Sequence, residues 1–179
     1  RRQLGAQHQR VGGISEGLAM PHGYTWGLQF LEVLFCEAGS SMVPPGPNGC
    51  TVLQATPQAT QAGGMLVARN YDFPNLLQRH QVIRRDTPTE AGRYATLTVT
   101  QLPLAGAHQG INEHGLVVTA NNARLWRGEH LRFRGVPFSM MLQEILETCA
   151  STKQALAFLR RTHNRANAGF LGLADPSGD

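Results

Sequence analysis

The sequence has few cysteines, a single lysine and no long apolar run. No apolar stretch reaches the roughly 18 residues that a transmembrane helix needs, so we expect no membrane span. The three cysteines are widely spaced, include no Cys-x-x-Cys pair and have no histidine at zinc-binding spacing. This pattern excludes a disulfide scaffold and a structural zinc site. We therefore expect no metal and no other cofactor.

The positive charge is carried almost entirely by arginine, and it is scattered. The formal net charge is +4, with Lys153 as the only lysine. Proteins that bind nucleic acids usually gather their cations on one face. The tightest group here is Arg124, Arg127, Arg132 and Arg134, which we interpret as a solvated loop. Nucleic acid is therefore not an expected partner, although a basic module that binds acidic partners stays open as a minor alternative.

The composition is typical of one folded domain. The chain has 179 residues, of which 41% are hydrophobic and 16% are charged, so disorder is not expected. A chain of this length buries enough surface to fold without covalent staples. The 20 glycines and 10 prolines indicate many turns and short strands.

Hydrophobic periodicity predicts two helical regions, one at the start of the chain and one before its last strand. Residues 11–38 read as helical with a break at Pro21, followed by a breaker-rich loop over residues 39–49. Residues 138–149 carry an apolar stripe at helical spacing, and Ser151 or Thr152 begins the next helix.

The middle of the chain reads as strands. Residues 50–53 and 65–68 predict a hairpin, and further strands are expected at 81–84, 94–100, 116–119 and 169–173. The order helices, strands, helices, strand predicts an α+β layered domain with antiparallel sheets.

Cys50 is the cysteine that is a candidate nucleophile. Cys36 and Cys149 lie on apolar helix faces, where a buried cysteine behaves as a small hydrophobic residue. Cys50 instead begins a predicted strand directly after Gly49, whose backbone can adopt angles that are closed to other residues. The Cys50 thiol could attack the Gly49 carbonyl, and hydrolysis of the resulting thioester would leave a free amino group on Cys50. An α-amino group titrates at about 7.7–8.0, so nucleophile and base would then belong to one residue.

Arg69 and Asp72 follow the second strand of the predicted hairpin. If the strands pair, both residues can reach Cys50. An arginine beside a thiol favours the thiolate, and a carboxylate beside an amino group orients that group. A surface ion pair within a loop is the alternative interpretation of these two residues.

Three motifs together carry a family resemblance. They are Asn48-Gly49-Cys50-Thr51, then Ala68-Arg69-Asn70-Tyr71-Asp72-Phe73, then the run from Gly110 to Asn121. In this order the chain resembles peptidase family C45, the acyl-CoA:6-aminopenicillanate acyltransferase-like group of N-terminal-nucleophile (Ntn) hydrolases. The segment Gly12-Gly13-Ile14-Ser15-Glu16-Gly17 resembles the family's pre-cleavage helix. The resemblance implies an αββα sandwich with antiparallel sheets, and we expect the sandwich to be incomplete at the carboxyl end. It also implies a pre-cleavage segment over 1–49, followed by the first part of the catalytic domain over 50–179.

The resemblance also implies a role for each matching residue. Cys50 matches the nucleophile exposed by cleavage after Gly49, Arg69 the arginine beside the thiol, and Asp72 the aspartate that steadies the new amino terminus. Asn121 matches an asparagine that lines the site and helps to hold the oxyanion, with Asn122 as the alternative by register. The implied activity is hydrolysis or acyl transfer at a linear amide bond through a thioester, on a small amide or acyl substrate.

Several points stay open at this level. A non-catalytic or truncated relative that binds an acyl or amide ligand without turnover is the principal alternative. A papain-like cysteine protease lacks the local signature that it would need. Oligomeric state and substrate are open. Because the chain begins with Arg1, a preceding targeting segment is open too; with no signal-peptide pattern in view, the cytoplasm is the compartment expected.

Overall fold

The computed structural model describes residues 4–42, 50–72, 78–122, 135–166 and 169–178 of the chain. Two helices come first, α1 (Gly5–Gly17) and α2 (His22–Met42). A hairpin follows, formed by β1 (Cys50–Ala55) and β2 (Leu66–Tyr71), with the short 3-10 helix η1 (Pro57–Ala59) between its strands. The remaining elements are β3 (Gln81–Asp86), β4 (Thr96–Gln101), β5 (Gln109–Asn112), β6 (Val117–Asn122), α4 (Phe138–Thr148), α5 (Thr152–Arg161) and β7 (Gly169–Ala174).

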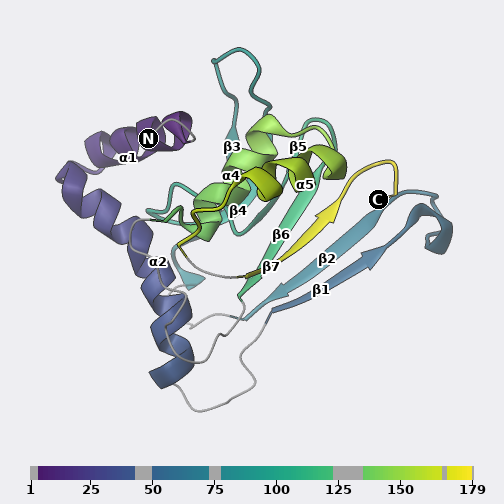
Figure 1. The fold of residues 1–179 in the computed structure, drawn as a ribbon, viewed down its shortest axis with the longest axis horizontal. Helices are drawn as coiled ribbons and strands as arrows, with labels where there is room; N and C mark the ends of the chain where they lie inside the picture. Colours follow the sequence, from purple (N-terminus) through teal and green to yellow (C-terminus); the bar gives the residue numbers. More distant parts are fainter. Residues whose placement is uncertain (1–3, 43–49, 73–77, 123–134, 167–168, 179) are drawn as a thin grey trace.

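The strands form two antiparallel sheets. One is the β1–β2 hairpin, and the other has the order β3-β4-β5-β6-β7. Helices α4 and α5 cover one face of the five-stranded sheet, and the hairpin lies against the other face near β6 and β7 (Figure 1). The described part of the chain is therefore an α+β structure with antiparallel sheets, as predicted, arranged in α, β and β layers.

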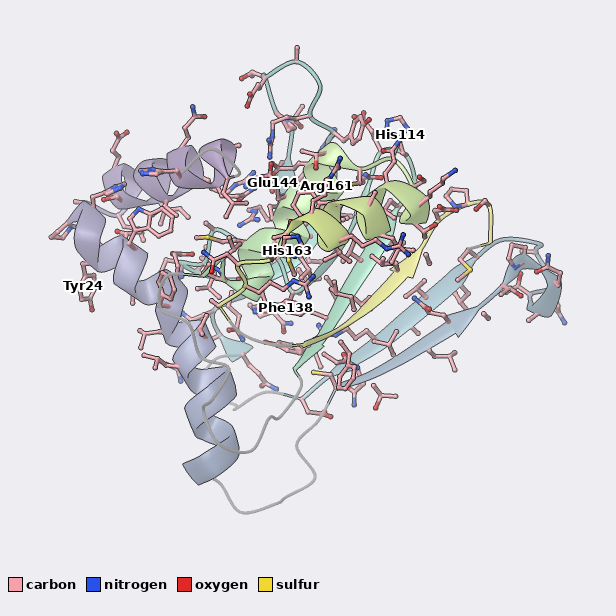
Figure 2. All side chains as sticks on the ribbon, viewed as in Figure 1. Tyr24, His114, Phe138, Glu144, Arg161 and His163 are labelled. Carbon is pink, nitrogen blue, oxygen red and sulfur yellow. The ribbon has the colours of Figure 1, made fainter. Side chains whose placement is uncertain are left out.

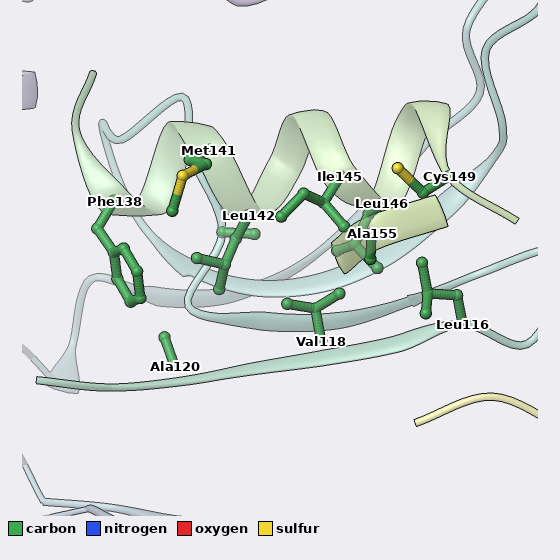
Figure 3. Close-up of a cluster of buried hydrophobic side chains, with 11 residues drawn as sticks. Leu116, Val118, Ala120, Phe138, Met141, Leu142, Ile145, Leu146, Cys149 and Ala155 are labelled. Carbon is green, nitrogen blue, oxygen red and sulfur yellow. The ribbon is translucent and has the colours of Figure 1, made fainter. Parts of the chain in front are cut away.

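The core lies between α4 and the middle of the five-stranded sheet (Figure 3). The apolar stripe predicted over residues 138–149 is confirmed, since Leu142, Ile145 and Leu146 are fully buried against Leu116 and Val118 of the sheet. Helix α5 is capped by Ser151, whose Oγ accepts a hydrogen bond from the Gln154 backbone N–H. This cap confirms one of the two predicted starts of that helix.

The hairpin approaches the larger sheet closely at Gly172. A Cβ atom at this position would lie 2.5 Å from Thr119 Oγ1 and 3.1 Å from Gln54 Nε2. Gln54 Nε2 also donates a hydrogen bond to the Leu173 carbonyl at 3.3 Å. A glycine in β7 therefore lets β1 lie directly on the larger sheet.

Several predicted boundaries were wrong. Helix α1 begins at Gly5 and not at residue 11. The prediction missed its first turns because they bury the polar Gln7 and show no apolar stripe. Helix α2 continues to Met42, so residues 39–42 are not loop. Proline, the residue that ends helices most strongly, does not occur between His22 and position 43 and is next found at position 44. Residues 43–49 lie outside the described part of the chain.

Strand β5 is absent from the prediction, and strand β4 buries its threonine face. Gly110 interrupts the apolar alternation that would have indicated β5. In β4 the three threonines at positions 96, 98 and 100 face α4 and are buried, whereas Leu97 is 48% exposed. The hydroxyls have polar partners there, because Thr96 Oγ1 accepts a hydrogen bond from Gln143 of α4 at 3.2 Å.

A buried polar network joins α1 to α4 and to the β3–β4 region. Glu147 is fully buried and accepts hydrogen bonds from Arg10 of α1, from Arg93 and, at 2.7 Å, from Gln143. Gln7 of α1 donates to Glu144 at 3.0 Å, on the side of α4 that faces α1 (Figure 2). The first helix is thus held to the sheet domain by this polar network and by Val11, which is fully buried against Ala105 and Met140. The division of the chain at residue 49/50 stays a prediction.

None of the described helices is both long enough and apolar enough to span a bilayer.

Candidate active site

The hairpin brings Cys50 and Arg69 onto one face. In the register of β1 and β2, Cys50 lies opposite Tyr71 and Val52 lies opposite Arg69. Cys50 and Arg69 are therefore diagonal neighbours whose side chains point toward the larger sheet. Both are half-buried. The structure places Arg69 within β2 rather than after it, because the strand continues to Tyr71 and does not end with its apolar run.

Arg69 is the centre of the site. Its Nη2 atom lies 3.4 Å from Cys50 Sγ and also donates to the Ala120 carbonyl. Its Nη1 atom donates to Gln109 Oε1 at 3.1 Å, and Nε lies 3.5 Å from Asn121 Oδ1. The guanidinium also lies over the Tyr71 ring, 4.4 Å from the ring centroid, at a distance typical of a cation–π contact.

Asn121 connects β6 to the backbone of Cys50. Its Nδ2 atom donates to the Cys50 carbonyl oxygen at 3.1 Å, while its Oδ1 atom faces Arg69. The amide thus directs one of its two N–H groups at the backbone of Cys50. The side chain of Asn122, the alternative by register, lies outside the described residues.

Asp72 lies near this group but is not bonded to it. It follows the Cys50–Tyr71 pair, at the end of the hairpin where the chain enters β1. Among the described residues its carboxylate accepts a hydrogen bond from Asn70 Nδ2 at 3.1 Å and none from Cys50. Gly49, on the other side of the predicted cleavage site, lies outside the described residues, as do the four arginines at 124–134.

Two contacts of the site were not predicted from the sequence. Gln109 at the start of β5 accepts a hydrogen bond from Arg69, and the Tyr71 ring stacks on His108 with 5.3 Å between ring centroids. A signal for Gln109 was present in the sequence. The turn at residues 112–115 leads into β6, and a tight antiparallel turn requires an incoming strand just before it.

The other described cysteine has a different environment. Cys149 is buried at the end of α4, and burial raises the pKa of its thiol. A raised pKa leaves the thiol protonated and unreactive. This agrees with the interpretation of Cys149 as a small hydrophobic residue, whereas the side chain of Cys36 is not among those described.

The described residues contain no cluster of three or more histidine, cysteine or acidic side chains that could hold a metal ion. What the site does contain is a thiol beside a guanidinium, with an amide held on the same residue. Such a group can stabilise a thiolate and present an N–H donor close to it.

Comparison with known proteins gives two findings. A family model described as acyl-coenzyme A:6-aminopenicillanic acid acyl-transferase matches residues 59–178, which is more than half of the chain. Among solved structures, penicillin V acylase from Agrobacterium tumefaciens is similar, with a TM-score of 0.38 and 16% sequence identity. The match covers 73% of this chain and 36% of the acylase chain. No curated protein sequence matches this chain.

Proposed function

Because the chain belongs to the acyl-coenzyme A:6-aminopenicillanic acid acyltransferase family, we propose that it is a self-activating cysteine amidase or acyltransferase of the Ntn type. Cys50 is its nucleophile, and the bond between Gly49 and Cys50 is its cleavage site. The observation that carries the proposal is the meeting of three side chains at one point. Cys50 Sγ lies 3.4 Å from Arg69 Nη2, and the Cys50 carbonyl is held by Asn121.

Activation would begin with the Cys50 thiol. The sulfur attacks the Gly49 carbonyl carbon, the peptide C–N bond breaks, and the nitrogen of Cys50 takes up the proton. Water then hydrolyses the Gly49 thioester, which leaves a carboxylate on Gly49 and both a thiol and an amine on Cys50. The new amine lies at the end of the hairpin that Asp72 follows, where a carboxylate would favour the ammonium form once it has accepted a proton.

Turnover uses the same atoms. The amine of Cys50 takes the thiol proton, and the thiolate attacks the carbonyl of a linear amide substrate. The negative oxygen of the tetrahedral intermediate is held by N–H donors, for which the second N–H of Asn121 is one candidate. The leaving amine takes the proton from the Cys50 ammonium, and the acyl group remains on sulfur as a thioester. Water then removes the acyl group in hydrolysis, and a second amine removes it in acyl transfer.

Arg69 supports both stages through its charge. A guanidinium beside sulfur favours the thiolate, which is the reactive form of cysteine. Asn121 would act on the nucleophile's backbone as well as on the substrate. The substrate class that fits is a small amide or acyl compound.

Mass spectrometry tests the cleavage directly. The protein is expressed from its complete reading frame, as the parent and as two variants, Cys50→Ala and Cys149→Ala. We expect two chains separated before Cys50 in the parent and in Cys149→Ala, and one uncleaved chain in Cys50→Ala. Cleavage at the same bond in Cys50→Ala would refute the mechanism.

Thiol labelling separates the proposal from a non-catalytic relative. With iodoacetamide we expect Cys50 to react much faster than Cys149, because Cys149 is buried among apolar side chains whereas Cys50 is half-buried. An uncleaved parent chain whose Cys50 does not react would instead indicate a protein that binds an acyl or amide ligand without turnover.

A further inference from the structure

Among the residues that the structure describes, every partner of the Arg69 guanidinium other than Cys50 is electrically neutral. In the described part of the chain these partners are the Gln109 amide oxygen, the Asn121 amide oxygen, the Ala120 carbonyl and the Tyr71 ring. No ion pair between Arg69 and a carboxylate is found among these residues, and Asp72 is bonded to Asn70 instead. The positive charge therefore stays available to the sulfur of Cys50.

Gln109 is the partner whose side chain determines how much of the Arg69 charge acts on the sulfur of Cys50. Its Oε1 accepts from Nη1 at 3.1 Å, whereas Nη2 of the same guanidinium points at Cys50 Sγ. A carboxylate in this place would have almost the same shape. It would form a charge-assisted bond to Arg69, draw the guanidinium toward itself and supply the negative charge that the thiolate otherwise provides.

Gln109 itself stands on a firmly held backbone. It pairs with Val99 of β4 and Thr119 of β6. The loop before it is fixed by Arg84, which donates to the carbonyls of Leu104 and Ala105, and by Gln29 Oε1, which accepts from the Ala105 N–H at 2.7 Å. A long arginine side chain loses considerable rotamer entropy when it is held in one geometry, and an anchored acceptor reduces the freedom that remains.

We propose that Gln109 is a positioning residue of the candidate active site. It holds Arg69 so that Nη2 stays at the Cys50 sulfur, and it does so without neutralising the guanidinium. The inference rests on the proposed role of Cys50 as the nucleophile. A purely structural role, in which Gln109 only ties the hairpin to β5, predicts a change in stability and no change in the reactivity of Cys50.

The charged and titratable groups around Cys50 all contribute to the pH dependence of its labelling rate. Among the described residues they are Arg69 and Tyr71 on β2, Asp72 after it, and His108 directly before β5. In a chain cleaved as proposed, the α-amino group of Cys50 joins them. The comparison is therefore made between variants that differ only at position 109, so that the contribution of the other groups is common to all of them.

The test uses Gln109→Glu, Gln109→Met and the matched control Gln54→Glu, each in the protein expressed from its complete reading frame. Gln54 lies on the same hairpin and donates to the Leu173 carbonyl, so its replacement adds the same charge without touching Arg69. The rate of iodoacetamide labelling at Cys50 is measured by peptide mapping from pH 5 to pH 10. Thermal unfolding is recorded in parallel.

In Gln109→Glu we expect the half-maximal labelling pH to rise by about one unit, which corresponds to about tenfold slower labelling at pH 7. In Gln109→Met the acceptor is lost but no charge is added, so we expect labelling to slow severalfold. Gln54→Glu should match the parent. The proposal is overturned if both Gln109 variants keep the parent profile, whether or not their melting temperatures fall, or if Gln54→Glu shifts the profile as much as Gln109→Glu does.

Labelling requires neither self-cleavage nor turnover, so the two proposals can fail separately. A parent chain that stays uncleaved would refute the proposed function while the Gln109 comparison still reports on the Arg69–Cys50 pair. A cleaved, active parent whose labelling profile ignores position 109 would refute the positioning role alone.

Discussion

The Nη2 atom of Arg69 lies 3.4 Å from the sulfur of Cys50, across the diagonal of a two-stranded hairpin. The two residues are 19 positions apart in sequence, and the register of β1 and β2 alone makes them neighbours. A guanidinium at this distance favours the thiolate over the thiol. We therefore expect the reactivity of Cys50 to depend on this charged side chain.

Replacing the Arg69 side chain should therefore slow the reaction of the Cys50 thiol with alkylating agents. In Arg69→Met, which keeps much of the length and removes the charge, we expect iodoacetamide labelling of Cys50 at pH 7 to slow by about tenfold or more. Arg69→Lys should be intermediate, because one ammonium cannot reach Gln109, Asn121 and Cys50 together. Arg79→Met removes an exposed arginine outside the site and is the control. Equal rates in Arg69→Met and the control would contradict the role of the guanidinium.

Asn121 should matter more for turnover than for thiol reactivity. Removing one oxyanion donor typically lowers kcat by about 10²–10³, and Asn121→Ala also frees the Cys50 carbonyl. We expect formation of the Cys50 thioester from a panel of N-acyl p-nitroanilides to fall by this factor, measured by mass spectrometry after hydroxylamine trapping. Labelling by iodoacetamide should change by less than tenfold. If Asn122→Ala produces the larger loss, the assignment belongs to Asn122 instead.

The polar network between α1 and α4 predicts a stability effect at Glu147. Burial alone would raise the pKa of this carboxyl, but the charge of Arg10 and the hydrogen bonds of Arg93 and Gln143 lower it below the ordinary value of 4.5. Removing one partner from a buried ion pair typically costs about 3–5 kcal/mol. We expect Glu147→Gln to lower the free energy of unfolding by about 3 kcal/mol at pH 7, measured by urea denaturation.

The same network should be sensitive to acid in a defined direction. Because the folded-state pKa of Glu147 is lowered, its contribution is complete above pH about 4.5 and is lost as the pH falls through the folded value. Stability should thus decline less between pH 5 and pH 3 in Glu147→Gln than in the parent. Glu16→Gln, an exposed change on α1, should keep both the parent stability and the parent slope.

Local patterns in the sequence were sufficient for the elements with strong periodicity. The hairpin that carries Cys50 and Arg69 and the helix pair that follows residue 137 are confirmed. These segments are indicated by apolar stripes, caps and turn residues that lie within a dozen positions of one another. The pairing of the hairpin was enough to predict that Arg69 would reach Cys50.

Contacts between distant segments were not predictable in the same way. The bond between Gln7 and Glu144 joins residues 137 positions apart, and no local pattern marks either residue as buried. The threonine face of β4 is buried because its hydroxyls find distant partners, which are Gln143 of α4 and the carbonyls of Arg84 and Gly106. Gln109 was missed for a related reason, since its partner Arg69 lies on another sheet and its strand is interrupted by Gly110.

Asp175 offers a test of the fold that is independent of the candidate site. Its carboxylate accepts hydrogen bonds from the backbone and hydroxyl of Thr152 at 2.8 and 2.9 Å, which fixes the start of α5, and from the Ser177 backbone at 2.9 Å. Burial works to raise the pKa of Asp175, but the hydrogen bond from the Ser177 hydroxyl, together with those from the Thr152 and Ser177 backbones and the Thr152 hydroxyl, outweighs it and lowers the pKa to about 2.

Since the folded-state pKa of Asp175 is depressed, its stabilising contribution is complete above pH about 4 and is lost as the pH falls toward 2. Replacing a carboxylate that caps a helix costs about 0.5–2 kcal/mol. We therefore expect Asp175→Ala to lower the melting temperature by several degrees at pH 7, and the difference from the parent to shrink as the pH approaches 2. Glu90→Gln removes an exposed carboxylate and should follow the parent at every pH. A difference between Asp175→Ala and the parent that stays constant from pH 7 to pH 2 would show that the lost side-chain packing, and not the charged carboxylate, holds the start of α5.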